Sequence, residues 1–373
     1  MAKAVYVGVG SKAHKMKKAY IGIGGKARKV KKMYIGVGGK ARLCYSAELE
    51  KVGMATALST TRYDMRAATV GKYALFAGGY ISKSSFGYSV SSSVDAYNTS
   101  LTKSTPTELS YKRCGHAAAS VGGYALFAGG ASSYNFLGYG KPVSSVDAYD
   151  ASLTRSAAHI IGATVAIGGA AVGNYALFAG GTVYSQINKD NVTSDVLAYD
   201  PSLTFTTAPL LSVARANVKG ASAVNYALFA GGRAGSFCTT VDAYNASLTR
   251  TTATALSSTK NNSAAATVGN HAIFVGNTAS ADIYDASLTK TSAAILSTAR
   301  TGLAATTVGD YAIFSGGGVA DFCDASLTRS SIGTSMTGYD MGAATIGDYA
   351  LFAGGHSGEK SDTAYDSVEV YTA

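Results

Sequence analysis

A seven-residue motif, Tyr-Ala-Leu-Phe-Ala-Gly-Gly, recurs along the chain and restricts its fold more than any other feature. Four close copies are followed by three weaker ones, at residues 73–79, 124–130, 175–181, 226–232, 271–277, 311–317 and 349–355. Successive phenylalanines of the motif are 51, 51, 51, 45, 40 and 38 residues apart. A period of this length is typical of repeat architectures, in which each repeat forms one small unit that packs against its neighbours.

Each repeat predicts four strands. An Ala-rich run such as 117–121 precedes the motif, and a Val-Asp-Ala-Tyr run such as 146–149 follows it. A turn of the type Asp150-Ala-Ser-Leu-Thr comes next, with further versions beginning at Asn98, Asp200, Asn245, Asp285 and Asp324. Asp and Asn favour such turns because their side chains accept hydrogen bonds from nearby backbone N–H groups. The fourth strand runs toward a Leu-Ser pair such as 109–110.

Seven four-stranded repeats predict an all-β fold, a seven-bladed β-propeller. A linear solenoid is the alternative, but it would need capping repeats, and none is recognisable in the sequence. The last repeat ends at Val368-Glu-Val-Tyr371, which matches a third strand, while residues 45–59 match the turn and fourth strand of other repeats. We therefore expect the N-terminal strand to complete the last blade, which removes two exposed sheet edges.

Residues 113–130 carry a family resemblance. They read Arg-Cys-Gly-His-Ala-Ala-Ala-Ser-Val-Gly-Gly-Tyr-Ala-Leu-Phe-Ala-Gly-Gly. This resembles a kelch repeat, with its Arg, its Gly-His, a small-residue strand and a strand ending in Gly-Gly, and the resemblance spans about residues 46–373. It implies a kelch-type propeller. The chain has no Trp, which the kelch pattern carries in each repeat. We expect the turn leucines Leu153, Leu248 and Leu288 to fill that space.

A second, shorter repeat occupies residues 1–45, which hold twelve Lys or Arg and no acidic residue. The chain has 32 Lys and Arg in all, so the remainder carries 20 basic against 22 acidic side chains, and the net charge of +10 belongs to this segment. Its tyrosines recur every 14 residues, each followed by an alternating run, a Gly turn and a basic run. Each copy predicts a small β-hairpin.

Isolated hairpins are marginally stable in water, so this segment is expected to dock on a partner or to oligomerise. The repeats resemble structural proteins of bacteriophage and prophage tails, which implies virion proteins as partners and assembly as a homo-oligomer. The expected docking residues are Tyr6, Tyr20, Tyr34, Lys26, Arg28, Lys40 and Arg42. Binding to an anionic or cell-wall polymer, binding to nucleic acid and a passive solvated face are the alternatives. One Tyr per repeat supplies little stacking surface, which disfavours nucleic acid.

No catalytic or metal-binding motif is recognisable, so a non-enzymatic protein without a cofactor or metal is expected. The five histidines form no His-x-His or His-Glu-x-x-His spacing, and the four cysteines form no Cys-x-x-Cys pair. His116 matches the kelch Gly-His position and His271 replaces a motif Tyr, so both are interpreted as structural. The copper ligands of kelch-fold oxidases and the Trp of sialidase-type acidic boxes are not found.

Ligand binding is predicted on the face that carries the loops between second and third strands. These loops are long in the first three repeats, at 80–93, 131–145 and 182–194, and they combine Tyr and Phe with Ser, Gly and Asn. Tyr in such a setting provides contact area at a low entropic cost. The predicted residues are Tyr80, Phe86, Tyr88, Tyr134, Phe136, Tyr139, Tyr184, Gln186 and Asn188. Unselected drift of long surface loops is the alternative explanation.

Four arginines precede the Ala-rich strands and belong to the same predicted face. They are Arg62, Arg113, Arg215 and Arg300. They are predicted either to meet an acidic ligand near the ring centre or to pack the blades through hydrogen bonds to carbonyl groups.

These observations predict a binding or structural protein, a phage or prophage tail component of the baseplate or fibre. Its propeller is expected to contact a host-surface glycan or protein, or another virion protein. An intracellular kelch-type interaction adaptor is the alternative. The start of the chain lacks the apolar core of a signal peptide, and no run of about 20 apolar residues predicts a membrane span. We expect synthesis in the bacterial cytoplasm and a final location in the virion tail.

Overall fold

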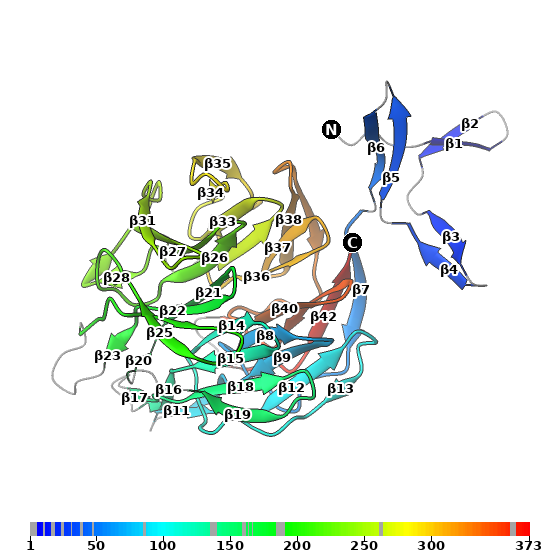
Figure 1. The fold of residues 1–373 in the computed structure, drawn as a ribbon. Coiled ribbons are helices and arrows are strands. Elements are labelled where there is room, and N and C mark those ends of the chain that lie inside the picture. Colours follow the sequence, from blue (N-terminus) through cyan, green and yellow to red (C-terminus); the bar gives the residue numbers. More distant parts are fainter. Residues whose placement is uncertain are drawn as a thin grey trace.

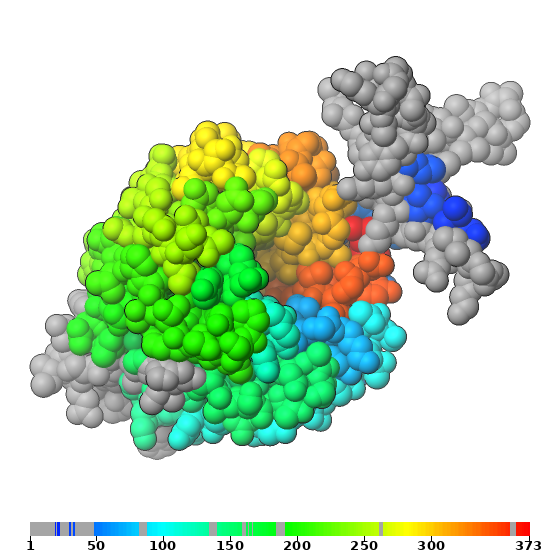
Figure 2. Space-filling view, viewed as in Figure 1, coloured from blue at the N-terminus to red at the C-terminus, as the bar shows by residue number. Residues whose placement is uncertain are grey.

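The computed structural model describes residues 6–9, 12–15, 19–23, 26–30, 32–37, 40–46, 48–84, 87–134, 140–158, 162, 164–165, 167–183, 191–260, 264–358 and 363–373. These residues form strands, turns and loops and no helix. Seven four-stranded antiparallel sheets are arranged as the blades of a seven-bladed β-propeller. Figure 1 and Figure 2 show the chain running around the ring from blade to blade, so that the last blade lies beside the first.

In six blades the strands lie in chain order from the central channel outward, and in the last blade β7 (Glu50–Ala55), from the N-terminal side, takes the outermost place. The innermost strands are β8 (Arg66–Val70), β14 (Ala117–Val121), β21 (Gly168–Val172), β26 (Lys219–Ala223), β32 (Ala264–Val268), β36 (Ala304–Val308) and β40 (Gly342–Ile346). The second strands are β9 (Tyr73–Ala77), β15 (Tyr124–Ala128), β22 (Tyr175–Ala179), β27 (Tyr226–Ala230), β33 (His271–Val275), β37 (Tyr311–Gly316) and β41 (Tyr349–Ala353). The Ala-rich runs and the repeated motif therefore form the strands predicted for them.

The outer half of each blade follows the same order. The third strands are β12 (Val94–Asn98), β18 (Val146–Asp150), β24 (Val196–Tyr199), β30 (Val241–Asn245), β34 (Ser280–Tyr284), β38 (Val319–Asp324) and β42 (Val368–Thr372). The outermost strands are β13 (Lys103–Ser104), β19 (Arg155–Ala158), β25 (Phe205–Ala208), β31 (Arg250–Ala253), β35 (Lys290–Ala294), β39 (Arg329–Gly333) and β7 (Glu50–Ala55).

Strand β7 closes the ring, as the sequence predicts. It pairs antiparallel with β42, with Val368 opposite Ala55 and Glu369 opposite Met54, so one blade contains both ends of the propeller sequence. The buried Glu369 carboxylate lies 2.7 Å from the Lys51 ammonium group. The closing strand is therefore held by an ion pair as well as by its backbone ladder.

The hydrophobic core lies between blades. One cluster, for example, joins Leu75 and Val94 of the first blade to Phe127 and Tyr149 of the second. In six of the seven blades the motif Phe packs edge-on against the third-strand Tyr, with 5.9 Å between the ring centroids of Phe76 and Tyr97, and the sixth blade has Cys323 in place of that Tyr. Burial of these rings is a large part of the stabilising free energy of such a fold.

The turns after the third strands behave as predicted. Asp150 Oδ1 accepts hydrogen bonds from the N–H groups of Ser152 at 2.8 Å and Thr154 at 2.9 Å. The turn leucine takes a left-handed conformation, with φ of 65° at Leu153, and packs against the core between the first two blades.

The motif glycines are also explained by close approach. Gly78 has φ of 66°, and a Cβ atom there would lie 2.4 Å from the Arg113 carbonyl oxygen. Only glycine fits that position without displacing backbone.

One end of the channel is bordered by a ring of hydroxyl groups, here called the hydroxyl girdle. Its members lie one residue before the end of the innermost strands, and each hydroxyl donates to the backbone carbonyl of the same position in the preceding blade. The donors are Thr69, Ser120, Ser222, Thr267, Thr307 and Thr345. The third blade has Ala171 at this position, which interrupts the girdle once.

The loops on the opposite face, here called the loop face, contain more strand than the sequence predicts. Hairpin β10 (Tyr80–Ser84) and β11 (Gly87–Val90) joins hairpin β16 (Ala131–Tyr134) and β17 (Gly140–Pro142) in a single sheet that bridges the first two blades. Short pairs β20 (Thr164–Val165) with β23 (Thr182–Val183), and β28 (Arg233–Ala234) with β29 (Ser236–Phe237), follow in the next blades.

Three further hairpins lie N-terminal to the propeller. They are β1 (Tyr6–Val9) with β2 (Lys12–Lys15), β3 (Tyr20–Ile23) with β4 (Lys26–Lys29), and β5 (Lys32–Val37) with β6 (Lys40–Ser46). In Figure 1 they lie outside the ring. The hairpin predicted for each basic repeat is therefore present.

Candidate ligand-binding site

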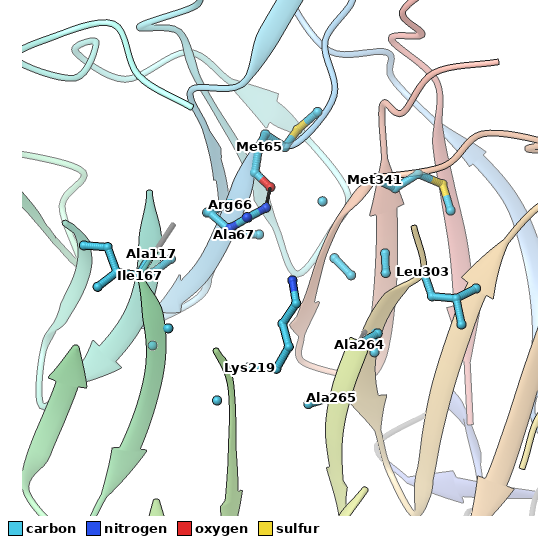
Figure 3. A pocket seen from close by; sticks show the side chains of 18 of the residues that line it. Met65, Arg66, Ala67, Ala117, Ile167, Lys219, Ala264, Ala265, Leu303 and Met341 are labelled. Carbon is cyan, nitrogen blue, oxygen red and sulfur yellow. Dashed lines mark hydrogen bonds between the residues drawn. The ribbon is translucent and has the colours of Figure 1, made fainter. Parts of the chain in front are cut away.

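The central channel opens on the loop face into a cavity of about 240 Å³. The cavity is lined by the first residues of the innermost strands, namely Arg66, Ala117, Gly168, Lys219, Ala264, Ala304 and Gly342, and by their neighbours. Small residues predominate at these positions, so their side chains do not fill the centre of the channel. Arg66 and Lys219 are the charged residues of the lining, and Figure 3 shows both side chains inside the cavity.

Arg66 is held in place by its neighbours in the sequence and across the blade boundary. Its Nη1 donates to Asp64 Oδ1 at 2.7 Å, and its Nε donates to the His116 carbonyl oxygen at 2.9 Å. Burial opposes the charge on Arg66, but the Asp64 carboxylate outweighs that effect and raises the pKa of Arg66. The guanidinium group is therefore a fixed positive charge in the wall.

The Lys219 side chain, in contrast, has no such partners in the described part of the chain. Within the part of the chain that the structure describes, its ammonium group makes no hydrogen bond and no ion pair. Burial and the Arg66 charge lower the pKa of Lys219, while the Asp64 and Asp340 carboxylates act in the opposite direction. In Figure 3 its side chain extends from β26 into the cavity.

Two carboxylates, those of Asp64 and Asp340, lie in the chain next to residues that line the cavity. Both residues have a left-handed backbone conformation, with φ of 52°. Asp64 N–H donates to the Asp340 carbonyl oxygen at 2.7 Å, which joins the first and last blades at the mouth. The remaining Asp64 oxygen accepts from Gly115 N–H at 3.2 Å, and Asp340 Oδ2 lies 3.1 Å from His356 Nε2. Burial opposes ionisation of Asp340, but His356, Lys219 and Arg66 together lower its pKa.

An aromatic cluster, here called the aromatic rim, adjoins this mouth. The Tyr63 ring stacks on Tyr80 with 5.2 Å between centroids and contacts His356 at 4.6 Å. Tyr80 contacts Tyr88 at 5.2 Å, and His356 contacts Tyr339 at 6.3 Å. The rim therefore follows the boundary between the first and last blades, directly beside Asp64 and Asp340.

Among the loop residues predicted from the sequence, Tyr80 and Tyr88 lie in the aromatic rim. The backbone of Tyr134 pairs with that of Tyr88 across the sheet that bridges two blades. The other predicted loop residues lie outside the described part of the chain. They are Phe86, Phe136, Tyr139, Tyr184, Gln186 and Asn188.

The predicted arginines have internal partners. Arg62, Arg113 and Arg215 are fully buried, and each forms an ion pair with an aspartate of its own blade, as Arg113 does with Asp147 at 2.7 Å. Arg300 pairs in the same way with Asp321 at 2.6 Å. The Arg113 guanidinium also donates to the Ser145 carbonyl oxygen at 2.9 Å. These groups serve blade packing, the second of the two roles considered above, and we leave them out of the binding surface.

Each aspartate of these pairs also joins neighbouring blades. Asp147 accepts hydrogen bonds from the N–H and hydroxyl groups of Ser110, which lies in the segment leading into the second blade. The third blade carries Thr164 and Leu197 at the positions of Arg113 and Asp147. The two members of the pair are thus lost together, a sequence signal that could have identified their role.

The predicted docking residues are distributed over the three N-terminal hairpins. Tyr6, Tyr20 and Tyr34 lie on the first strand of each hairpin, opposite Lys15, Lys29 and Leu43. Lys26, Arg28, Lys40 and Arg42 lie on the second strands.

Three further titratable side chains, those of His116, Cys114 and Cys323, are buried in the propeller. His116 is buried, and burial lowers its pKa well below the ordinary value, so the ring is neutral. Burial raises the pKa values of Cys114 and Cys323. Over the described ranges no group of three or more His, Cys, Asp or Glu side chains is placed to bind a metal ion. The described residues also contain no apolar helix of membrane-spanning length.

Comparison with known proteins supports the fold and goes no further. No family model matches the chain, and no curated protein matches it in sequence. The chain is similar to a solved structure titled "Structure of YjhT", at 12% identity and a TM-score of 0.55, over 86% of this chain and 99% of that chain. The chain is a seven-bladed β-propeller. At such low identity the similarity shows the architecture alone.

Proposed function

We propose that this protein is a non-enzymatic binding protein and that its ligand occupies the channel mouth on the loop face. The aromatic rim carries the proposal. Tyr80, Tyr88, Tyr339 and His356 are partly exposed and lie beside a cavity with fixed charges. A concave site in which apolar surface and a few oriented polar groups converge is the usual form of a ligand site.

A saccharide is the ligand class that this surface favours. Tyrosine rings offer a flat apolar face for the C–H groups of a sugar ring and a hydroxyl for its polar edge. Their few rotatable bonds make the entropic cost of binding small. The compatible biological ligand is a polymer on a host cell surface.

We further propose that the protein is a phage or prophage tail component of kelch type, docked by its N-terminal hairpins. Two sequence resemblances support this, that of residues 113–130 to a kelch repeat and that of the basic repeats to tail proteins. The hairpins are two-stranded, and such units need a partner to be stable. Another virion protein is the corresponding partner.

The test is binding of the labelled full-length protein to whole cells, and to purified surface polysaccharide, of candidate bacterial hosts. The double variant Tyr80→Ala/Tyr88→Ala should bind at least tenfold more weakly, because it removes two of the four partly exposed rings of the rim. Tyr175→Ala is the matched control, since Tyr175 is a partly exposed tyrosine at the opposite end of a blade.

Equal binding by the wild type and the double variant would contradict a site at the rim. Absence of binding to any cell or polysaccharide, together with capture of a defined intracellular peptide in the channel mouth, would instead favour the adaptor function.

A further inference from the structure

The innermost strands are nearly uniform, and two residues interrupt them. Of the first positions, five carry Ala or Gly, while the first blade carries Arg66 and the fourth carries Lys219. Two blades separate these residues in one direction around the ring and three in the other, so they approach the channel from opposite sides. Figure 3 shows the two side chains within one cavity.

Lys219 brings no evident benefit to the fold. A charged group that is moved out of water loses free energy unless a partner compensates it. Arg66, Asp64 and Asp340 all have specific partners, whereas Lys219 has neither a hydrogen bond nor an ion pair in the described part of the chain. Residues that break a local rule without a structural gain are concentrated at functional sites.

The two carboxylates of the mouth do not cancel this charge at short range. Asp64 spends one oxygen on Arg66 and the other on Gly115 N–H. Asp340 Oδ2 faces His356. Arg66 donates through Nη1 and Nε, which leaves its Nη2 without a hydrogen bond among the described residues. Among the described residues of the lining, the charged side-chain donors that remain for a ligand are therefore Lys219 Nζ and Arg66 Nη2.

The aromatic rim and the cavity wall are joined by one short stretch of chain. Tyr63, Asp64, Met65 and Arg66 are consecutive, and they lead from the stacked rings down into the cavity wall. A ligand that places a ring against Tyr80 can thus direct a substituent into the channel. The rest of the lining is apolar, mostly Ala and Gly with Met65, Ile167, Val218, Leu303 and Met341, so the charged side chains that the substituent meets in the lining are Arg66 and Lys219.

We propose that the ligand is an anionic saccharide whose carboxylate or phosphate group enters the channel mouth between Lys219 and Arg66. This inference rests on the saccharide-binding function proposed above and adds the chemical class of the ligand. Hydrogen bonds between charged donors and an anionic oxygen are the stronger ones, and a partly enclosed cavity strengthens them further.

The test compares three sugars by isothermal titration of the full-length protein. Methyl β-glucuronide carries a carboxylate, glucose 6-phosphate carries a phosphate, and methyl β-glucoside is the neutral reference. At least one anionic sugar should bind tenfold or more tightly than the glucoside. The relative affinities of the two anionic sugars identify which group the site prefers.

Lys219→Met should remove this preference, so that the ratio of anionic-sugar affinity to glucoside affinity falls to about one. Lys219→Arg should retain most of the preference. Lys72→Met is the matched control, because Lys72 is an exposed lysine in the turn between β8 and β9 at the other end of the channel. Its affinity for all three sugars should equal that of the wild type.

Equal affinity for the neutral and anionic sugars would overturn the inference while leaving saccharide binding intact. An anionic preference that survives in Lys219→Met would also overturn it. Absence of any anionic-sugar binding would do the same, and cell-surface binding, measured separately, would then decide whether the broader function stands.

Discussion

The two mouths of the channel are formed by opposite ends of the same seven innermost strands. They differ in whether the blades carry the same kind of residue at equivalent positions. At one mouth six of the seven blades place a hydroxyl at the same position, and the hydroxyl girdle joins each to the preceding blade. At the other mouth the corresponding first positions carry Arg, Ala, Gly or Lys.

The difference teaches where to look for function in a repeated fold. A residue that recurs in nearly every blade, such as the buried aspartate of the third strand, satisfies a need that every blade shares. A residue that occurs once, such as Lys219, satisfies a need of the whole ring or of its ligand. Loss of a repeated residue should therefore cost stability, and loss of a unique one should cost binding.

The largest expected effect comes from a repeated position. Arg113→Ala leaves the Asp147 carboxylate buried without its main partner, so the free energy of unfolding should fall by about 3–5 kcal/mol. Chemical denaturation monitored by circular dichroism measures it. Arg233→Ala, at an exposed arginine of the loop face, should change stability by less than about 0.5 kcal/mol.

The third blade supplies the rescue for that variant. Arg113→Thr with Asp147→Leu copies Thr164 and Leu197 into the second blade and leaves no buried charge unpaired. This double variant should recover at least about half of the stability lost by the Arg113→Ala variant, because replacing both members of a buried pair costs less than removing one. A double variant less stable than Arg113→Ala would show that the pair has a value beyond mutual compensation.

A smaller effect is expected where the ring closes. Burial opposes ionisation of Glu369, but Lys51, the Ser335 N–H group and the Tyr371 hydroxyl outweigh it and lower its pKa below 4.5. The stability that this carboxylate contributes is therefore present at neutral pH and is lost as the pH falls through the lowered pKa. Glu369→Gln should cost about 1–3 kcal/mol at pH 7 and make the loss between about pH 5 and 3 shallower.

Urea denaturation at a series of pH values tests this. Glu108→Gln is the control, since Glu108 is exposed. Parallel stability curves for the wild type and Glu369→Gln would show that the closing ion pair does not contribute in the way that the geometry indicates.

The gap in the hydroxyl girdle predicts a gain. Ala171→Ser supplies the missing donor toward the Ser120 carbonyl oxygen and should raise the free energy of unfolding by about 0.5–1.5 kcal/mol, the range of one added hydrogen bond. Calorimetric melting detects it. Ala118→Ser is the control, because Ala118 lies on β14 two residues before the girdle position Ser120, and it should produce no such gain. A loss of stability in Ala171→Ser would mean that the third blade requires the gap.

The smallest effect on stability is expected at Lys219. Because Lys219 lacks a partner in the described chain, Lys219→Met should leave the free energy of unfolding unchanged or raise it slightly, by about 0.5 kcal/mol or less, so the melting temperature should not fall. A clear fall in melting temperature would indicate a structural role and would weaken the distinction between repeated and unique residues.

The sequence predicted the architecture well because the repeat itself carries the information. The seven motifs, the third-strand pattern and the truncated last unit led to seven blades, to the strand order and to closure by an N-terminal strand within residues 45–59, which the structure shows as β7. The Asp and Asn turns were predicted from local hydrogen bonding, which does not depend on distant contacts.

The site was predicted less completely, since it depends on distant contacts. Tyr80 and Tyr88 were identified from composition, but the stacking of Tyr80 on Tyr63 and the nearness of His356 arise only when the last blade meets the first. Arg66 and Lys219 were missed because they stand in runs that look like core strands. The sequence signal that could have identified them is a basic residue at the first position of an innermost strand, where the other five blades have Ala or Gly.

The measurement closest to the central claim is a titration of the full-length protein carrying ¹³C-methyl methionine with methyl β-glucuronide. Met65 and Met341 line the cavity at the loop face, whereas Met336, which shares the core between the last two blades with Met341, is outside that lining. The account predicts that the Met65 and Met341 methyl resonances shift with added sugar while that of Met336 does not. Saturable binding that leaves both Met65 and Met341 unmoved would contradict it.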